Sequence, residues 1–367
     1  MKKLIALILA LVMVLALVAC GTTTETTETT EPTETTETTE TATVKTLYVL
    51  TPNPDHGWTG AVGVAAQEKV EEINAAGGDV KAELLASASA DEQIKQIEDI
   101  VANNPGDGSI GVAMLPQNTD VENAIQSLVD AGIPYAAADR IIPAVAPTAV
   151  SNVKYDNVEI GAAAAAWLTS KGMVEGDKVV VIEGDGSSAD TDRTDGFNKY
   201  LLGEVEYAGA KIETPWTSLD SVSYSGATGW NPANAQAYFE TYMANADNAD
   251  TKYIASWDDG LSTGVFEALN GSAIDEATKE TFLAGAPYIT GCGGSQTLYD
   301  VIGGKYDVYP VAESFGEVMS VTYPPAMIQV TIQAMLDYFA GAEVLQENTQ
   351  SAECVTAENV ANYKGFE

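Results

Sequence analysis

Short apolar runs alternate with longer helix-like segments along most of the chain. Strands are expected at residues 46–51, 80–85, 110–115, 134–137, 148–152, 178–183, 210–213, 253–257, 288–291 and 308–311. Helices are expected at residues 59–75, 90–102, 121–131, 157–170, 191–202, 234–243 and 260–269. Strands that are apolar along their whole length and alternate with helices are typical of parallel sheets covered by helices on both faces. The pattern therefore predicts an α/β fold.

The N-terminal residues do not follow this pattern. Two lysines precede an apolar run, Leu4 to Ala19, that is shorter than the roughly 20 residues needed to cross a bilayer. Residues 1–19 are therefore predicted to be a secretory signal peptide. The run ends in Leu17-Val18-Ala19-Cys20, which resembles the lipobox of bacterial lipoproteins. The resemblance implies that Cys20 carries two acyl chains and anchors the protein to the outer face of the cell membrane. An ordinary signal peptide followed by a chance cysteine is the alternative.

Thr-Thr-Glu repeats follow the predicted signal peptide. From Gly21 to Val44 the chain contains no aromatic residue, almost no apolar residue and a single proline, Pro32. Burial of side chains cannot offset the entropy of ordering such a segment. Residues 20–44 are therefore predicted to be the lipidated cysteine and a disordered tether.

The remaining part of the chain is long enough for two domains. The whole chain has 367 residues, so about 323 remain after the tether, against roughly 150 for a typical domain. The whole chain contains 17 basic and 53 acidic residues and has a formal charge of −36. Such a charge repels phosphate backbones and anionic head groups. We therefore expect no binding to nucleic acid, and contact with a membrane only through the lipid anchor.

The chain contains too few cysteine and histidine residues for a zinc site or a Cys-His catalytic pair. Cys292 and Cys354 are far apart in the sequence, and the only histidine, His56, lies upstream of both. A zinc site or a Cys-His nucleophile would need more ligands than these, and we expect neither a metal nor another cofactor. The two cysteines are either free thiols or a disulfide, which an exported protein permits.

Polar and aromatic residues directly follow the predicted strands. In open parallel sheets, ligands bind beyond the carboxyl ends of the strands. The loops there are rich in carboxylates, amides and aromatic rings, with Arg140 and Arg193 nearby. Carboxylates accept hydrogen bonds from hydroxyl groups, and aromatic faces cover the C–H side of a sugar ring. This inventory indicates a neutral, polyhydroxylated ligand.

From Lys45 to Val344 the chain resembles the extracytoplasmic sugar-binding proteins of ABC importers, of the ribose/galactose-binding type. The resemblance is carried by Asp55 and Trp58, Asp139-Arg140, Arg193-Thr194-Asp195-Gly196-Phe197, Asp258-Asp259 and Glu313. It implies the type I periplasmic binding protein fold, in which two similar doubly wound lobes are joined by three crossovers and close on a ligand. The first lobe would comprise residues 45–152 and 314–341, and the second residues 153–313 and 342–367.

The resemblance also implies a role for each candidate residue. Asp139 and Arg140 would hold ring hydroxyls from the first lobe, where Trp58 would pack on the sugar. The second lobe would contribute Arg193, Trp230 and Asp258, and Glu313 would stand at a hinge. The complete set of predicted ligand-binding residues is Asp55, Trp58, Asp139, Arg140, Arg193, Trp230, Asp258 and Glu313.

The candidate residues depart from the ribose-binding pattern and also have structural explanations. Asp258 and Glu313 fall where ribose binders carry amides, and Gly293 falls where they carry an aspartate. This departure favours an amino sugar or another ligand with a cationic group over ribose itself. The structural alternatives are a surface ion pair for Asp139-Arg140, local pairing of Arg193 with Asp190 or Asp192, core packing for the tryptophans and a solvated strand end for Glu313.

These observations predict a monomeric, non-enzymatic receptor that delivers a sugar-like ligand to an ABC permease and its ATPase. The chain has no G-x-x-x-x-G-K-[ST] motif, so ATP hydrolysis would come from the partner. The same scaffold could instead be a sensor subunit for a membrane kinase or chemoreceptor. A secreted carbohydrate-active enzyme is a third hypothesis, because paired carboxylates can hydrolyse glycosidic bonds. The G-x-S-x-G pattern at Gly260 to Gly264 does not support a hydrolase triad, which needs a histidine downstream of the serine.

Overall fold

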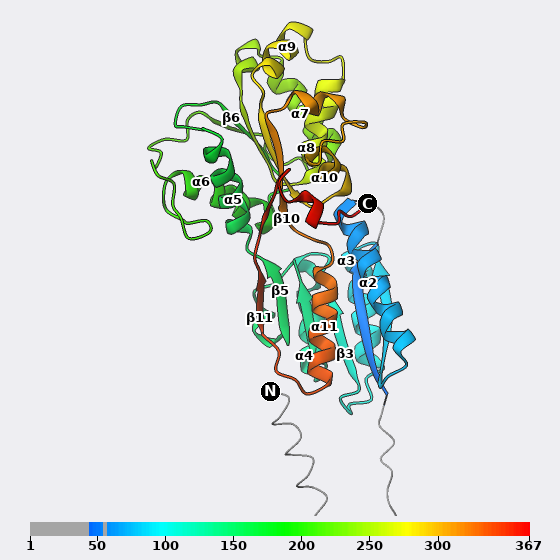
Figure 1. Ribbon diagram of the computed structural model, residues 1–367. Helices are drawn as coiled ribbons and strands as arrows, with labels where there is room; N and C mark the ends of the chain where they lie inside the picture. Colours follow the sequence, from blue (N-terminus) through cyan, green and yellow to red (C-terminus); the bar gives the residue numbers. More distant parts are fainter. Residues whose placement is uncertain (1–43, 54–56) are drawn as a thin grey trace, which may run out of the picture. The chain divides into compact units, whose positions relative to one another are not determined.

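The computed structural model of the protein describes residues 44–53 and 57–367 (Figure 1). The predicted signal peptide, Cys20 and all of the tether before Val44 lie outside the described residues. So do Asp55 and His56. Among the described helices, none combines the length and the apolar character that a membrane crossing requires.

The described residues form two six-stranded sheets. The first has the strand order β11-β5-β4-β3-β1-β2 and the second the order β12-β10-β9-β8-β6-β7. All neighbouring strands are parallel except β10 and β12. The bounds are β1 (Lys45–Pro52), β2 (Val80–Ser87), β3 (Ile110–Met114), β4 (Tyr135–Ala138), β5 (Ser151–Tyr155), β6 (Val179–Ile182), β7 (Val222–Tyr224), β8 (Tyr253–Ser256), β9 (Tyr288–Gly293), β10 (Glu317–Thr322), β11 (Glu347–Gln350) and β12 (Cys354–Val355). The predicted α/β class is confirmed.

Helices cover both faces of each sheet. Their bounds are α2 (Gly57–Ala76), α3 (Ala90–Ala102), α4 (Glu122–Asp130), α5 (Asn157–Ser170), α6 (Ser188–Leu201), α7 (Pro232–Met243), α8 (Asp259–Asn270), α9 (Glu276–Ala284), α10 (Gln296–Ile302) and α11 (Met327–Phe339). Side chains of α3 and α4 form one buried cluster with the first sheet, and those of α7 and α8 form another with the second. We call each sheet with its helices the first lobe and the second lobe.

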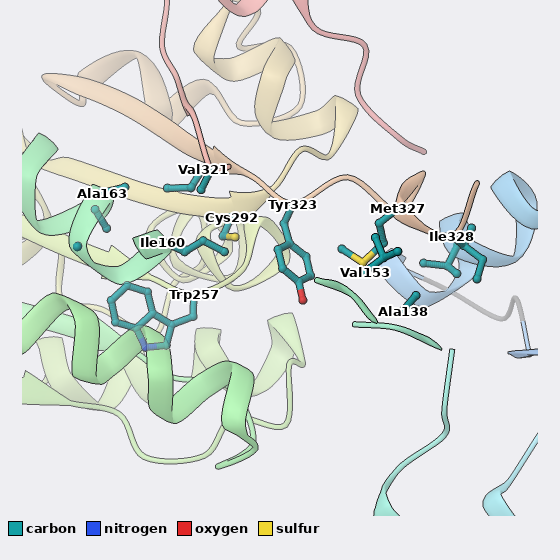
Figure 2. Close-up of a cluster of buried hydrophobic side chains, with 14 of the residues drawn as sticks. Ala138, Val153, Ile160, Ala163, Trp257, Cys292, Val321, Tyr323, Met327 and Ile328 are labelled. Atoms are coloured by element: carbon teal, nitrogen blue, oxygen red, sulfur yellow. The ribbon is translucent and has the colours of Figure 1, made fainter. Parts of the chain in front are cut away.

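A third buried cluster extends through both lobes. It joins α2 and α11 of the first lobe to α5 and α6 of the second. Figure 2 shows Tyr323 within this cluster, with Ile160 and Cys292 on one side and Val153 and Met327 on the other. The apolar core is therefore continuous through the region where the chain passes between the lobes.

The burial of the inner strands explains why apolar runs in the sequence predict them. Every residue of β3, β4, β6 and β8 is buried. A strand with helices on both faces has no solvent side, so both of its alternating sets of side chains must be apolar or small. The predicted strands at 110–115, 134–137, 178–183 and 253–257 overlap these four.

Two of the predicted strands are wrong. Residues 308–311 enter a short 3₁₀ helix, Pro310–Ser314, because a proline lacks the N–H that a strand needs and suits the first position of a helix. Residues 210–213 contribute only an isolated bridge from Ala210 to Tyr207. Only Ile212 is partly buried in that segment, and the edge strand forms later, at β7.

The chain crosses between the sheets at positions that differ from the expected lobe boundaries. β5 continues to Tyr155 and pairs with β4, so residues 153–155 belong to the first sheet. β10 pairs with β9, which places residues 317–322 in the second sheet. β11 returns to pair with β5 in the first sheet. In Figure 1, α11 and β11 accordingly lie beside strands of the first sheet although they come late in the sequence.

Candidate functional site

The carboxyl ends of strands from both sheets meet in one cluster of polar and aromatic side chains. Asp139 directly follows β4 of the first sheet, and Tyr323 directly follows β10 of the second. The Tyr323 hydroxyl donates a hydrogen bond to Oδ1 of Asp139. The Tyr323 ring also lies 5.2 Å from the ring of Tyr155, at the end of β5. Loops at the two strand edges are therefore in direct contact.

Asp139 is held in an unusual backbone conformation. Its φ angle is +60°, a region that aspartate enters more readily than most side chains. Its N–H donates to the carbonyl of Val153 at 2.9 Å, which ties the turn to the neighbouring strand. The Asp139 side chain is only 11% exposed. The carboxylate is thus directed into the cluster, and a strained position of this kind is common at binding sites.

Arg140 lies beside this carboxylate but is much more accessible. Its Nε atom is 3.8 Å from Oδ2 of Asp139, and its side chain is 41% exposed. Its Nη1 atom donates to the carbonyl of Gln117 at 2.5 Å. These contacts orient the guanidinium along the strand edge while leaving part of it open to a ligand.

A cavity of about 250 Å³ opens beside Arg140. Its lining residues are Pro52, Asn53, Thr59, Ser87, Ala88, Gln117 and Arg140. They come from α2 and from the carboxyl ends of β1, β2, β3 and β4, the edge at which ligands of parallel sheets bind. A larger cavity of about 610 Å³ lies at the opposite, amino-terminal part of β1 and β2, away from the residues described above.

Arg193 is the most deeply placed charged group in the cluster. It is 4% exposed, and its Nε atom donates to Oδ1 of Asn157 at 2.9 Å. Its Nη1 atom donates to the carbonyl of Trp257 at 2.5 Å. The guanidinium lies 4.6 Å from the ring centre of Tyr323 and 5.6 Å from that of Trp230. A planar cation is well suited to such stacking between aromatic faces.

Close packing of α5 against α6 fixes the backbone position of Arg193. A Cβ atom at Gly161 of α5 would lie 1.9 Å from the carbonyl oxygen of Arg193 on α6, and one at Gly196 would lie 2.0 Å from that of Val158. Only glycine permits the two backbones to approach this closely. The spacing of small residues on α5 and α6 therefore determines how far Arg193 extends toward Tyr323.

Trp230 covers the other side of Arg193. It has a φ angle of +58°, which is rare for a bulky side chain. Its ring lies against Gly184, where a Cβ atom would come within 2.2 Å of Trp230 Cζ2. The missing side chain at position 184 thus provides the space that the indole ring occupies.

Trp58 belongs to the first lobe and is held in place by Tyr323. Its Nε1 atom donates to the backbone carbonyl of Tyr323 at 2.7 Å, and the two ring centres are 5.4 Å apart. Trp58 is half-buried near the start of α2. Residues 54–56, including the predicted ligand residue Asp55, lie outside the described residues directly before this helix.

Asp258 and Asp259 are adjacent in the sequence but have different partners. Asp258 caps α8, accepting at Oδ1 from the N–H of Gly260 at 2.7 Å. The pKa of the Asp258 carboxyl is raised to about 7, mainly by burial and also by the negative charge of Asp259, although the Gly260 N–H and the Arg193 cation act in the opposite direction.

Asp259 is a structural group. It is 1% exposed and accepts from the N–H groups of Gly294 and Ser295 and from the hydroxyl of Ser320. Burial is the main cause that raises its pKa. These bonds tie the ends of β8, β9 and β10 together, so that Asp258, not Asp259, is available to the cluster.

Glu313 does not belong to this group of residues. It is exposed and lies in the 3₁₀ helix before β10, at the amino-terminal end of that strand. The predicted role of Glu313 at a hinge is therefore wrong. The chain crosses from β10 to α11 through Tyr323 and two prolines, Pro324 and Pro325.

Tyr323 is the residue that sequence reasoning missed. It contacts Trp58 and Asp139 of the first lobe and Arg193 of the second. The apolar pattern predicts the final strand of this region at residues 308–311, whereas the strand lies at 317–322. The pattern therefore does not identify Tyr323 as a residue at the end of a strand. The available signal was the partly apolar segment Val318 to Thr322, which is interrupted by Ser320 and followed directly by Tyr-Pro-Pro.

The described cysteines and acidic residues form neither a reactive thiol nor a metal site. Cys292 and Cys354 are both free thiols, which decides between the two alternatives that the sequence left open. Burial raises the pKa of Cys292 to about 12, so its thiol is un-ionised and unreactive at neutral pH. No group of three or more potential metal-ligating side chains is found within residues 44–53 and 57–367.

Comparison with known proteins agrees with this geometry. Residues 47–343 match the family described as a periplasmic binding protein domain. The chain belongs to this family. As a periplasmic binding protein domain it is a binding protein and not an enzyme, as the sequence predicted. No match to a curated protein was found.

Solved structures share the fold of this periplasmic binding protein domain at low sequence identity. One is the periplasmic binding protein component of the arabinose ABC transporter from Shewanella sp. ANA-3, with 15% identity, a TM-score of 0.64 and coverage of 87% of this chain and 94% of that one. A myo-inositol binding protein from Caulobacter has 18% identity, a TM-score of 0.64 and coverage of 88% and 96%. An ABC sugar transporter subunit from Rhodobacter sphaeroides has 20% identity, a TM-score of 0.62 and coverage of 86% and 99%.

Proposed function

We propose that this protein captures a small sugar or sugar-like solute between its two lobes and delivers it to an ABC permease. The observation that supports this proposal most strongly is the cluster formed by Trp58, Asp139, Arg193 and Asp258, to which both lobes contribute. A site assembled from two walls favours a closed conformation when a ligand bridges them, because only that conformation makes both sets of contacts.

The chemistry of the cluster suits a polyol. The Asp139 carboxylate and the exposed part of the Arg140 guanidinium can accept from and donate to hydroxyl groups. Trp58 and Trp230 offer aromatic faces for the C–H side of a ring. The related structures from Shewanella sp. ANA-3 and Caulobacter hold arabinofuranose and myo-inositol, both small polyhydroxylated rings.

Intrinsic tryptophan fluorescence provides the test, because Trp58 and Trp230 both lie in the cluster. The protein is titrated with pentoses, hexoses, inositols, amino sugars and nucleosides. At least one member is expected to bind with a Kd below about 1 mM. If none binds below that concentration, the assignment of a sugar-like ligand is wrong.

The lipid anchor at Cys20 is a second part of the proposal. It rests on the apolar run that ends at Cys20 and on the tether that follows, and it would hold the receptor on the outer face of the membrane near its permease. Expression of the full chain and of Cys20→Ser in a bacterial host tests it. The wild type should remain in the membrane fraction, whereas a variant that also stays there would contradict lipidation at this residue.

A further inference from the structure

Tyr323 makes, from within the protein, contacts of the kind that a sugar ring would make with the cluster. Its hydroxyl donates to the carboxylate of Asp139, as a ring hydroxyl of a ligand would. Its ring lies under the guanidinium of Arg193, at 4.6 Å. Tyr323 is 6% exposed, so its side chain fills the space between these two groups rather than lining an open surface.

The position of Tyr323 is fixed from several directions. Trp58 donates to its backbone carbonyl at 2.7 Å, and the rings of Trp58 and Tyr155 lie 5.4 and 5.2 Å from its own. Pro324 and Pro325 follow in the crossover and restrict the backbone there. The ring is therefore held between the lobes even where the hydroxyl bond to Asp139 breaks.

We propose that Tyr323 is an internal competitor for the ligand, because its hydroxyl occupies Oδ1 of Asp139, an acceptor that a ligand hydroxyl would otherwise take. This inference rests on the proposed function and deepens it. A ligand has to replace the bond between Tyr323 and Asp139 before it gains its own, so the tyrosine lowers the affinity and selects for ligands that bind the carboxylate better than a phenol does.

The consequence is that removing one oxygen atom should tighten binding. Tyr323→Phe keeps the ring beside Arg193 and Trp58 but leaves the Asp139 carboxylate without its phenol donor. A ligand hydroxyl can then donate to Oδ1 of Asp139, which the phenol no longer occupies, while Oδ2 keeps its place 3.8 Å from the Arg140 Nε atom. Hydrogen bonds to charged groups are strong enough that we expect the affinity to rise about tenfold.

The matched control is Tyr135→Phe. Tyr135 is also a buried tyrosine of the first lobe, 1% exposed, and its hydroxyl donates to the carbonyl of Val145 at 2.5 Å. It belongs to the buried cluster on the other face of the first sheet and has no contact with Asp139. Its loss should leave the ligand affinity within about twofold of the wild type, since it removes a buried hydroxyl without changing the site.

Two measurements test the inference. The first is a double-mutant cycle in urea, in which Tyr323→Phe and Asp139→Gly are combined without any ligand; glycine removes both acceptor oxygens and tolerates the φ angle of +60° at this position. The two stability changes should be non-additive, whereas strict additivity would show that the hydroxyl and the carboxylate do not interact and would overturn the competitor role.

The second measurement is the fluorescence titration of wild type, Tyr323→Phe and Tyr135→Phe against the same ligand panel. Tighter binding by Tyr323→Phe alone is the expected result. If the wild type binds a ligand and Tyr323→Phe binds it equally or more weakly, Tyr323 is not a competitor, although the proposed function stands. If no panel member binds to the wild type or to Tyr323→Phe, the proposed function fails, and the competitor role fails with it.

Discussion

The two arginines of the cluster come from different lobes and are held in different ways. Arg140, on the first lobe, has a side chain that is 41% exposed and lies beside an open cavity. Arg193, on the second lobe, is 4% exposed. Its guanidinium donates hydrogen bonds to Asn157 and Trp257 and stacks on two aromatic rings.

This difference predicts that removal of each arginine has a different effect on stability. An exposed arginine can be removed with little loss of stability, because water replaces its contacts. A buried arginine leaves acceptors without donors when it is removed. The cation of the second lobe is therefore part of its buried core, whereas the cation of the first lobe lines an open cavity.

Arg193→Ala should have the largest effect on stability. It leaves the carbonyl of Trp257 and Oδ1 of Asn157 without their donor and creates a space between Tyr323 and Trp230. We expect the free energy of unfolding to fall by about 3 kcal/mol, measured by urea denaturation. A loss below about 1 kcal/mol would mean that the burial of Arg193 is not important for the fold.

Gly161→Ala tests whether helix packing positions Arg193. The added Cβ atom would lie 1.9 Å from the carbonyl oxygen of Arg193, so α5 and α6 must move apart at a cost of about 2 kcal/mol. Gly78→Ala is the control, because a Cβ atom there meets nothing within 4 Å and the stability should change by less than about 0.5 kcal/mol. Equal effects of the two substitutions would refute a specific role for the helix contact.

Asp258→Asn should change how stability depends on pH. Since the folded-state pKa of Asp258 is raised to about 7 from an ordinary value of 3.8, the folded protein holds a proton that the unfolded chain releases. The wild type therefore loses stability as the pH rises from about 4 to about 7, by roughly 1 to 2 kcal/mol for this partly accessible group.

The asparagine variant is an internal reference for that measurement. Asparagine caps a helix as well as aspartate does, so α8 should keep its start, and all other titrating groups are shared with the wild type. The difference in unfolding free energy between the two proteins should decline with pH over this range. A constant difference would show that Asp258 titrates at an ordinary pKa.

Arg140→Ala should have the smallest effect on stability and a clear effect on binding. The free energy of unfolding should change by less than about 0.5 kcal/mol, because the Arg140 side chain is 41% exposed and water can replace its contacts. Binding of a ligand identified in the fluorescence panel should weaken by about 2 kcal/mol, since the ligand loses a charged donor. Unchanged affinity would show that Arg140 does not contact the ligand. A large loss of stability would show that Arg140, like Arg193, is important for the fold.

The sequence predicted the inner part of the fold well for a clear physical reason. β3, β4, β6 and β8 are buried on both faces, which requires an unbroken apolar run that is visible without any knowledge of partners. Polar residues after such runs, such as Asp139 and Asp258, then mark the carboxyl edges of the sheets.

Strand β10 of the second sheet was not predictable in this way. β10 contains the polar residues Ser320 and Thr322 although it is largely buried. Ser320 is tolerated because its hydroxyl donates to Asp259, a partner 61 positions away. The run therefore did not read as a buried strand, and the role expected for Glu313 was wrong as a result.

The amino-acid sequence by itself determined the α/β class, the order of most elements and the strand ends that carry polar side chains, because each of these depends on local patterns of burial. Only the tertiary structure decided which of those side chains meet. The contact of Tyr323 with Asp139, the burial of Arg193 and the separation of Asp258 from Asp259 all depend on packing between segments that are distant in the chain. Such contacts are set by the backbone geometry of both lobes together, and no local pattern encodes them.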